Sequence, residues 1–544
     1  MKKLLIIAAL ALGANSTNAQ TCDYVVLSGT ISSNTTLSAS NKYLIRGCVN
    51  VNNGATLTIP AGTQLHGEKA TGGLLIIEKN AMINAVGTST NPIIFTSDQP
   101  VGTKAEGDWR GIAIAGNGTY NVSSIDIVKS CGTFAAGGAN NADNSGILRY
   151  ARIEFAGGLL SGDGTPAALL LAGVGSGTTI DHVHVSKSIS DGIIYRGGAV
   201  QLNQIITNDV RRRDLLVQDG YQGKMQDVLL LRNNAGIFDA AGSRGVEVAN
   251  NTVVPYTGSP ITRPVFSNFT ILGPGYCGSP IPPQMDHAVL LSKNAEAEFY
   301  NSVIAGYTNG FTIEDNSTIN NANVNGTILA SYNTFYANTN TYANNPANFD
   351  PTGTGCAPTI ITWMDGTYPC SQIDNFERLS LTAYAANVCG NYCTTAPSFV
   401  LASINNLGSP DFSWDAGNDF NHVSYRGGMG ASDWAGSWTN FCPQNTEYCP
   451  ELLMKPTTGN SLRFVPNPAR QDVAAVFSTD ITGPAALTIS DKVSGRLYRT
   501  VKAHIADKGT QQIAFKVSGL AEGMYMVRLT LSDGSVLSAP LSVQ

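Results

Sequence analysis

The chain has 544 residues, of which 43% are hydrophobic and only 13% are charged, with 57 glycines and a formal net charge of −6. The hydrophobic share excludes a disordered chain, and a negative chain without a basic stripe excludes nucleic acid as a partner. The length exceeds one ordinary compact domain, which favours either several domains or a repeat array that grows along one axis.

Residues 1–19 have the features of a signal peptide. Lys2 and Lys3 form a positively charged start, an apolar run covers residues 4–12, and a small-residue cleavage site precedes Gln20. The apolar run is too short to span a bilayer, and no later stretch is long and apolar enough to serve as a transmembrane anchor. We therefore expect export through the periplasm to the cell surface or the extracellular medium.

All ten cysteines lie beyond this leader. An even number of cysteines in an oxidising compartment predicts disulfides rather than a metal site. Closeness along the chain suggests three local pairs: Cys22–Cys48, Cys356–Cys370 and Cys442–Cys449. The sequence leaves open how the other four pair: Cys131, Cys277, Cys389 and Cys393.

From residue 30 to residue 116 the chain alternates short apolar strands with glycine-containing turns. We expect strands at 55–60, 74–77, 92–95 and 112–114, a spacing of roughly 18 residues that suits the first turns of a solenoid. Helical periodicity is absent, which indicates parallel β-structure. Residues 117–146 interrupt this rhythm with Gly, Ala and Asn and are interpreted as a long loop that leaves one corner.

Between residues 178 and 305, an apolar strand introduced by Asp or Asn returns with a period in the low twenties. The Asx residues are Asp181, Asn203, Asp227, Asn268 and Asn301. We expect them to stack as a ladder, and the residues two and four positions later to form buried columns. The intervening column, which includes His184 and Ile206, is also mostly apolar, so one sheet should have a covered outer face. The fold class predicted is all-β, with a parallel β-helix with loop insertions at 20–393.

Residues 330–460 are less regular than the repeat. We place an irregular, disulfide-containing cap and linker at 394–460 and expect it to cover the end of the solenoid. Strands with ordinary alternation follow, at 473–477, 486–490 and 525–531. They predict a separate small immunoglobulin-like β-sandwich at 461–544.

The motifs of this last segment stand in the order seen in sorting domains of the type IX secretion system. They are Pro466-Asn467-Pro468, Gly495, and Gly523 with Tyr525. The resemblance implies delivery by the type IX secretion machinery, removal of the domain, and attachment to the cell surface or release. The chain departs from the family in ending at Gln544 without a basic tail. An ordinary sandwich module is the alternative.

Residues 54–445 resemble a family of uncharacterised surface proteins that carry this sorting domain. The resemblance rests on residues 55–63, 91–97, 107–111, 145–155 and 438–441. It implies a right-handed parallel β-helix and no established activity. The stretch matching 208–220 is acidic and aromatic in that family, whereas this chain has Asp209-Val-Arg-Arg-Arg-Asp214 there. A ligand role of that stretch therefore does not transfer.

Parallel β-helices also carry polysaccharide lyases and glycosidases, which need paired carboxylates, or a cation with a basic residue, on an exposed sheet. The candidate catalytic residues are Asp181, His182, His184, Asp191 and Arg196, with Asp209 and Arg211–Arg213 beside them. His182 and His184 share a strand face and are expected to point the same way. Each candidate also has a structural explanation: the Asx ladder, a turn, or a solvated corner of arginines with Asp209 and Asp214.

Two further groups carry weaker signals. Asp98, Glu106 and Asp108 are candidate ligands for a structural calcium ion, and no other cofactor is expected. Four aromatic residues at 331–342 suit either stacking on sugars or packing of that loop: Tyr332, Phe335, Tyr336 and Tyr342.

Fold and predicted destination together favour a surface or secreted protein that works in adhesion or glycan binding without catalysis. The alternatives are a polysaccharide lyase or glycoside hydrolase on the same scaffold, and a structural component of the surface layer. Two carboxylates about 5–10 Å apart in an open groove would favour the enzyme. A flat surface of Asn, Ser and Thr would favour binding or a structural role.

Overall fold

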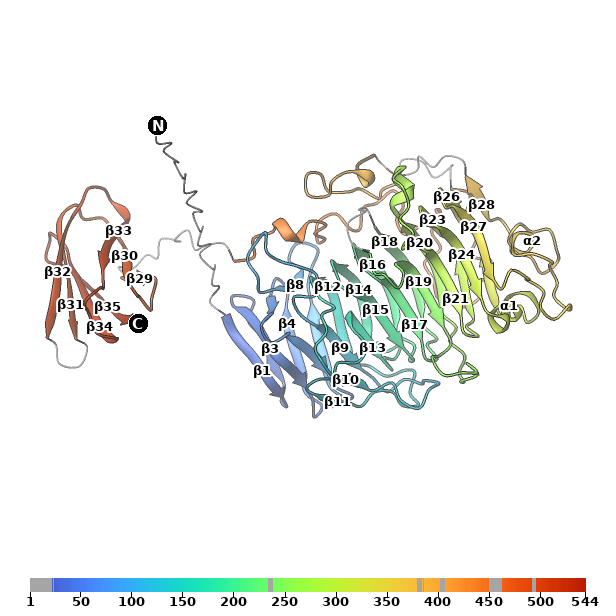
Figure 1. The fold of residues 1–544 in the computed structure, drawn as a ribbon, viewed down its shortest axis with the longest axis horizontal. Helices are drawn as coiled ribbons and strands as arrows, with labels where there is room; N and C mark the ends of the chain where they lie inside the picture. The colour runs from blue at the N-terminus through green and yellow to red at the C-terminus, as the bar shows by residue number, and fades with distance from the viewer. Residues whose placement is uncertain are drawn as a thin grey trace, which may run out of the picture. The chain divides into compact units, whose positions relative to one another are not determined.

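Figure 1 shows the computed structural model of the chain, which describes residues 22, 24–232, 238–378, 384, 386–401, 407–449, 462–491 and 496–544. The chain divides into two compact units, Met1–Tyr448 and Cys449–Gln544. The predicted signal peptide, the linker at 456–460 and Gly495 of the sorting motif lie outside the described residues.

The first unit is a nearly closed solenoid built on one sheet of 26 strands. Each turn of the chain adds a strand to each of three stacked faces, and the pairing between consecutive turns is parallel throughout. Parallel strands without intervening helices therefore wind around a common interior, as the repeat predicts (Figure 1). The all-β fold class and the parallel β-helix are confirmed.

The three faces are defined by their strands. Face A contains β2 (Thr35–Thr36), β4 (Thr56–Pro60), β7 (Met82–Val86), the first halves of β12 (Gly146–Glu154), β14 (Thr179–Ser186), β16 (Gln201–Asn208), β18 (Lys224–Leu231) and β20 (Val265–Leu272), then β22 (Ala297–Tyr300) and β25 (Ile328–Ser331). Face B contains the first halves of β1 (Tyr24–Ile31) and β3 (Lys42–Val51), then β5 (Gln64–Gly67), β8 (Ile93–Ser97), the second halves of β12 to β20 of face A, β23 (Val303–Ala305), β26 (Thr334–Tyr336) and β28 (Phe376–Arg378).

Face C contains the second halves of β1 and β3, then β6 (Leu74–Ile77), β9 (Gly111–Ala115), β13 (Ala167–Ala172), β15 (Asp191–Arg196), β17 (Arg213–Gln218), β19 (Arg244–Ala249), β21 (His287–Ser292), β24 (Asn309–Glu314) and β27 (Asn340–Asn345). A hairpin of β10 (Ile127–Lys129) and β11 (Gly132–Phe134) lies in the predicted loop and pairs antiparallel.

The interior of the solenoid is apolar along its length because every second residue of each strand points inward. On face A, Ile180, Leu202 and Met225 follow one another in register and are buried. On face B, Val183 and Ile205 do the same. The resulting hydrophobic core extends without a break from the first turns to the last.

The corner between faces A and B corrects the predicted Asx ladder. The left-handed residues of this corner, with φ between 48° and 61°, are Tyr150, His182, Gln204, Asp227, Asn268, Asn301 and Tyr332. Asp181 and Asn203 stand one position earlier, in register with Gln226. The predicted ladder is therefore wrong in its first two turns, and Val183 and Ile205 are continued by Val228 instead of Leu229. A left-handed His or Gln costs roughly 1–2 kcal/mol, so residue type alone does not reveal the corner.

The irregular segment predicted to cap the solenoid instead runs back along face B. We call its described residues 399–401 and 407–448 the strap. It passes from the last turns toward the first. Side chains of successive strands form hydrogen bonds with its backbone or with the hydroxyl of Tyr448. Hydrogen bonds mark this path: Asn301 with Asp411, Thr270 with Gly428, Arg152 with Trp438, and Glu154 with Tyr448.

The strap explains why the outer side of face B is apolar. Ile206, Leu229 and Val303 point outward and are buried against strap residues that include Met429 and Trp438. The predicted covered outer face is thus confirmed, although its cover comes from a segment far away in sequence. Local pattern shows that a strand is buried on both sides, not what buries it.

The end of the core is covered by residues that precede the strap. The helices α1 (Asn316–Asn323) and α2 (Ile360–Met364) each begin at a side-chain cap, supplied by Asp315 and Thr359. Trp363 is fully buried in the continuous core. No helix in the described part of the chain combines the length and apolarity needed to cross a bilayer.

Four disulfides join segments of the first unit: Cys48–Cys131, Cys277–Cys389, Cys356–Cys370 and Cys393–Cys442. Cys356–Cys370 is the predicted local pair. The predicted pairs Cys22–Cys48 and Cys442–Cys449 are wrong, because Cys48 and Cys442 bond to more distant cysteines. A solenoid brings residues of different turns together, so closeness along the chain is a poor guide. No described cysteine is free.

The second unit is a sandwich of two antiparallel sheets. One sheet has the order β29 (Arg463–Val465), β30 (Asp472–Thr479), β33 (Gly509–Lys516), and the other has the order β32 (Leu497–Ile505), β31 (Gly483–Asp491), β34 (Gly523–Thr530), β35 (Val536–Val543). Their inner faces share one apolar core, as the alternating strands predict.

Motif residues of this unit have structural roles. Tyr525 is buried and its hydroxyl donates to the Ala521 carbonyl at 2.7 Å, which fixes the turn before β34. Asn467 lies between Pro466 and Pro468, and its carboxamide oxygen accepts from the Ser542 backbone N–H at 2.8 Å. Gly523 begins β34 with a φ of 156°.

Candidate functional site

The outer side of face A carries a strip of polar side chains. Residues that alternate with the buried core positions point outward here, and most are partly or fully exposed. We call these residues the polar strip: Thr56, Thr58, Asn84, Arg149, Thr179, Asp181, Gln201, Asn203, Lys224 and Glu298. Amide and hydroxyl groups on a regular lattice of strands offer donors and acceptors at repeated spacings.

Along its edge the strip meets the strap in an aromatic group that we call the corner cluster. The Arg149 guanidinium contacts the Asp181 carboxylate at 2.6 Å, and His182 Nδ1 lies 2.8 Å from the other carboxylate oxygen. The His182 ring stacks on Tyr150, with 4.0 Å between centroids, and its edge faces the partly exposed Trp434 of the strap at 6.4 Å.

Electrostatics keep Asp181 ionised in this cluster. Partial burial would raise the pKa of the Asp181 carboxyl, but hydrogen bonds from His182 and Arg149 lower it below its usual value. A carboxylate held by a guanidinium is a hydrogen-bond acceptor and a poor proton donor. The cluster therefore suits ligand binding better than general acid catalysis.

His184 does not join His182 at the surface. It points outward from face B, where the strap covers it, and its ring packs on Phe441 at 4.9 Å. Burial, reinforced by the Arg152 charge, lowers the pKa of His184 to about 3. Its Nδ1 accepts a hydrogen bond from the Asn440 backbone at 3.3 Å. The expectation that both histidines face one ligand is wrong, because the corner at His182 turns the chain between them.

The other two catalytic candidates lie on face C. Asp191 is fully buried, and its two oxygens bind Arg213 of the next turn at 2.7 Å each. Arg196 similarly holds the buried Asp219 at 2.7 Å. The five candidates are therefore distributed over three faces. Asp191 and Arg196 are explained as ion pairs between turns, which are costly to break once buried.

The arginine-rich stretch at 209–214 is also structural. Arg211 binds Glu106 at 2.9 Å, and the Asp214 carboxylate binds Arg232 at 2.9 Å with both side chains almost completely buried. Burial raises the pKa of Asp214 to about 6 against the opposing effect of Arg232. The predicted solvated corner is wrong for Arg213 and Asp214, which are both buried.

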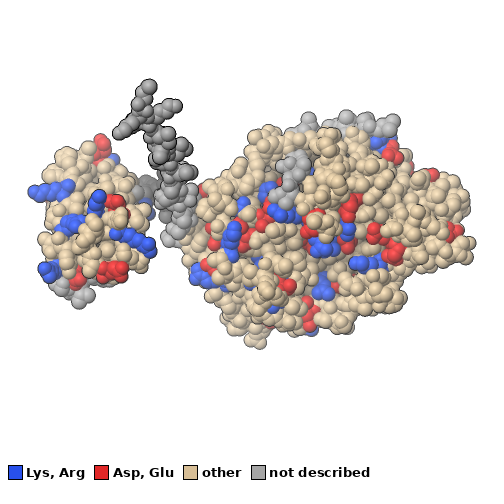
Figure 2. Space-filling view, viewed as in Figure 1, with Lys and Arg blue, Asp and Glu red and all other residues tan. Residues whose placement is uncertain are grey.

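Charged side chains on the side of the solenoid seen in Figure 2 gather in a band where basic and acidic residues alternate. Pairing between turns produces such alternation. On face C, Arg244 binds both Glu247 at 2.7 Å and Asp286 at 2.8 Å. Burial would raise the pKa of Glu247, but Arg213 and Arg244 lower it. Carboxylates that are paired with arginines do not supply the acid and the free carboxylate that glycoside hydrolysis needs.

The three candidate calcium ligands have protein partners. Asp108 accepts from the Ser97 hydroxyl at 2.6 Å and binds Lys69 at 2.8 Å. Glu106 points to Arg211, and Asp98 accepts from the Gln99 carboxamide at 2.7 Å. A structural calcium ion at these residues stays a prediction.

The aromatic residues at 331–342 mostly pack. Phe335 is buried in the core and Tyr342 contacts its ring edge-on at 5.0 Å. The sequence does not single out a second aromatic group, which lies where the strap meets β22: Trp414 stacks on Tyr300 at 3.9 Å, and Phe412 stacks on His422 at 4.7 Å. The strap residues of both aromatic groups belong to the segment assigned to the end of the solenoid, so their approach to face A was missed.

The profile of the pectate-lyase-like β-helix domain family matches residues 29–367. The chain belongs to this family. The match covers nearly all the strands of the solenoid and leaves the strap and the sandwich outside. No curated protein matches the sequence.

Three solved structures illustrate how distant the comparisons are. The enzymatically active domain of tailspike protein 2 of bacteriophage CBA120 is 10% identical, with a TM-score of 0.18, over 92% of this chain and 72% of that one. A β-glucosidase from Listeria innocua in complex with glucose is 10% identical, with a TM-score of 0.12, over 44% of this chain and 36% of its own. The CARDB domain of a Pyrococcus furiosus protein is 15% identical, with a TM-score of 0.12, over 16% and 92%. Similarity this low carries no argument about activity.

Proposed function

We propose that the chain is an exported surface or secreted protein that binds glycans along face A without cleaving them. The observation that carries this proposal is the polar strip with an aromatic group at two places along its edge. Sugar rings are recognised by hydrogen bonds to their hydroxyls together with contacts of their C–H faces to aromatic rings. The strip offers both, on a rigid sheet.

The spacing of the aromatic groups fits an extended ligand. The corner passes from His182 to Asn301 in four turns of the solenoid, which corresponds to about 19 Å at roughly 4.8 Å per strand. A linear polysaccharide lying along the strip would contact the corner cluster at one end and the Trp414 group at the other. Because the lattice repeats, such a site tolerates ligands of different length.

Non-catalytic binding is favoured by the state of the acidic residues. Asp181, Asp191 and Glu247 are each held by an arginine of an adjacent strand, which sets the geometry of these pairs. The lyase or hydrolase alternative requires a carboxylate, or a base beside a cation, that is free to accept a proton. The uncharged residues of the polar strip supply hydroxyls and amides, and its two carboxylates, Asp181 and Glu298, are each paired with an arginine.

Glycan binding is tested with the full mature chain on a glycan array, followed by calorimetry on the best ligand. Trp434→Ala should weaken binding at least about fivefold, since aromatic contact residues at binding sites cost more than about 1 kcal/mol when truncated. Tyr368→Ala, an exposed aromatic near α2, is the matched control and should bind as the wild type does. Equal affinities of all three proteins would contradict the proposed site.

Catalysis is tested separately by incubating the same protein with each polysaccharide that it binds. We expect intact polymer after prolonged incubation. Release of soluble oligosaccharides would replace the binding proposal with the lyase or hydrolase alternative.

We further infer that the second unit delivers the chain to the type IX secretion machinery. Support comes from the motif order and from the buried Tyr525 turn and the Asn467 contact to β35, which make the motif part of a folded sandwich. Deleting residues 462–544 should leave the protein in the periplasm of a producing cell. Unchanged display at the surface would refute this route.

A further inference from the structure

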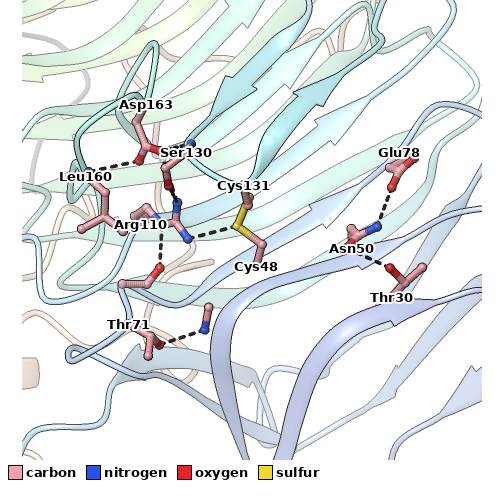
Figure 3. Close-up of a disulfide and its surroundings, with 12 residues drawn as sticks. Thr30, Cys48, Asn50, Thr71, Glu78, Arg110, Ser130, Cys131, Leu160 and Asp163 are labelled. Carbon is pink, nitrogen blue, oxygen red and sulfur yellow. Dashed lines mark hydrogen bonds and ion pairs between the residues drawn. A yellow bond between two sulfur atoms is a disulfide. The ribbon is translucent and has the colours of Figure 1, made fainter.

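The disulfide Cys48–Cys131 ties the β10–β11 hairpin to the edge of the solenoid (Figure 3). Cys48 lies in β3, and Cys131 is an exposed residue in the turn of the hairpin. The bond crosses 83 positions of sequence. Cys131 is thus an exposed residue on a turn, whereas Cys48 is partly buried against the body of the protein.

The partly buried sulfur has a cation as its neighbour. Arg110 Nη2 donates to Cys48 Sγ at 3.1 Å, and the same guanidinium reaches Ser130 Oγ at 3.0 Å and Asp163 at 3.2 Å (Figure 3). Its Nε also donates to the Gly72 carbonyl at 2.5 Å. These contacts hold the guanidinium in place, with only 3% of the Arg110 side chain exposed.

The buried charges around this sulfur do not balance. Lys129, also buried, places its ammonium on the Thr165 carbonyl at 3.0 Å and interacts with both Arg110 and Asp163. Two cations therefore face one carboxylate, which is itself shared with backbone N–H groups of Ser130 and Leu160. A thiolate at Cys48 would neutralise the excess positive charge. Cys393 provides a contrast, since its sulfur accepts from the neutral Gln444 amide at 2.9 Å.

We propose that Cys48–Cys131 is a site of thiol–disulfide exchange, with a small thiol such as glutathione as co-reactant. The attacking thiolate bonds to the sulfur of the exposed residue Cys131, the Cys48–Cys131 bond breaks, and the electron pair leaves on Cys48 as a thiolate beside Arg110. The products are a mixed disulfide at Cys131 and a free Cys48 thiolate. Low-pKa thiols are good leaving groups, and an adjacent arginine lowers a thiol pKa.

Exchange at this bond releases a cover on face C. The hairpin and its flanking residues, among them Ile125 and Ile127, pack over outward-pointing apolar residues that include Leu74, Ala113 and Leu170. With the disulfide open, packing and hydrogen bonds alone hold the hairpin there. The proposal is independent of glycan binding on face A, because it concerns a different face and a different chemistry.

The first experiment treats the full mature chain with limiting reduced glutathione, traps free thiols with iodoacetamide and maps peptides by mass. Cys48–Cys131 should open at least about tenfold faster than Cys356–Cys370 in the same molecules. Glutathione should appear on Cys131 and the alkyl group on Cys48. Equal rates for the two disulfides, or glutathione on Cys48, would overturn the proposal.

The second experiment measures the cation's effect directly. In a Cys131→Ser variant, Cys48 is the added free thiol, and its alkylation rate should be half-maximal at least one pH unit below the ordinary value of about 8.5. Adding Arg110→Gln should move that midpoint back toward the ordinary value. If Arg110→Gln prevents folding, Lys129→Met takes its place. A midpoint at or above the ordinary value in the Cys131→Ser variant refutes the leaving-group argument.

Discussion

Replacing His184 with isoleucine should make the contact between strap and solenoid less sensitive to mild acid. The side chain lies in a column continued by Ile206 and Leu229, so isoleucine suits the position. His184 packs on Phe441 of the strap. The Arg152 charge and burial both disfavour its protonated form. Protonation would therefore place an additional cation beneath the strap.

The pH window follows from the two pKa values. Folded His184 has a pKa of about 3, whereas an unfolded histidine titrates near 6.5. Between these values the unfolded chain binds more protons, so stability from the neutral imidazole is complete above about pH 6.5 and falls as the pH decreases. At pH 4.5 the difference of about 2 pH units from the unfolded pKa corresponds to roughly 3 kcal/mol.

Urea unfolding of the first unit, followed by the fluorescence of strap tryptophans such as Trp438, is the assay. The wild type should lose roughly 3 kcal/mol more than His184→Ile between pH 7 and pH 4.5. Ile206→Val is the control, because it should lower stability by about 1 kcal/mol at both pH values without altering their difference. An identical acid-induced loss in the wild type and in His184→Ile would refute the reasoning.

Other contacts lead to further predictions. Arg213→Met should cost about 3–5 kcal/mol by leaving Asp191 buried without its cation, and Asp191→Asn in the same chain should recover most of this loss in urea unfolding. Cys393→Ser with Cys442→Ser opens a link across 49 positions, worth about 4 kcal/mol in the chain-entropy model, and should accelerate proteolysis within the strap; an unchanged cleavage rate would contradict it. Tyr525→Phe should lower the stability of the second unit by about 1 kcal/mol in thermal unfolding, since one buried hydrogen bond is lost.

The solenoid was predictable because its signal is local and repeated. An apolar strand that returns every twenty or so residues needs neighbours of the same kind, and stacking provides them. The predicted period rests on Asp181, Asn203, Asp227, Asn268 and Asn301, although only the last three occupy the left-handed corner. The repeat is still recognisable although Asp181 and Asn203 stand one position before the corner. A shift of one position hardly changes a spacing of twenty or so residues between strands.

The candidate site was predictable only in part. Asp181 and His182 lie at the corner cluster, but the pattern could not separate His182 from His184, because an alternating strand would point both the same way. Only the left-handed conformation at His182 breaks that alternation. Asp191 and Arg196 look equally suited to chemistry in the sequence. Their partners, Arg213 for Asp191 and Asp219 for Arg196, lie one turn of the solenoid later, about twenty residues along the chain. A short sequence motif does not reach that far.

The strap decides which faces of the solenoid can act. It removes the outer side of face B from solvent and also contacts face A, where Asp419 pairs with Lys224 of the polar strip and Gln226 is buried against Asn421. It also contributes aromatic rings at two places along the edge of the polar strip, with Trp434 beside His182 and Trp414 on Tyr300. The strap buries Trp438 completely but leaves Trp414 and Trp434 partly exposed. Substitution of the partly exposed Trp414 or Trp434 can therefore separate a binding role of the strap from its covering role.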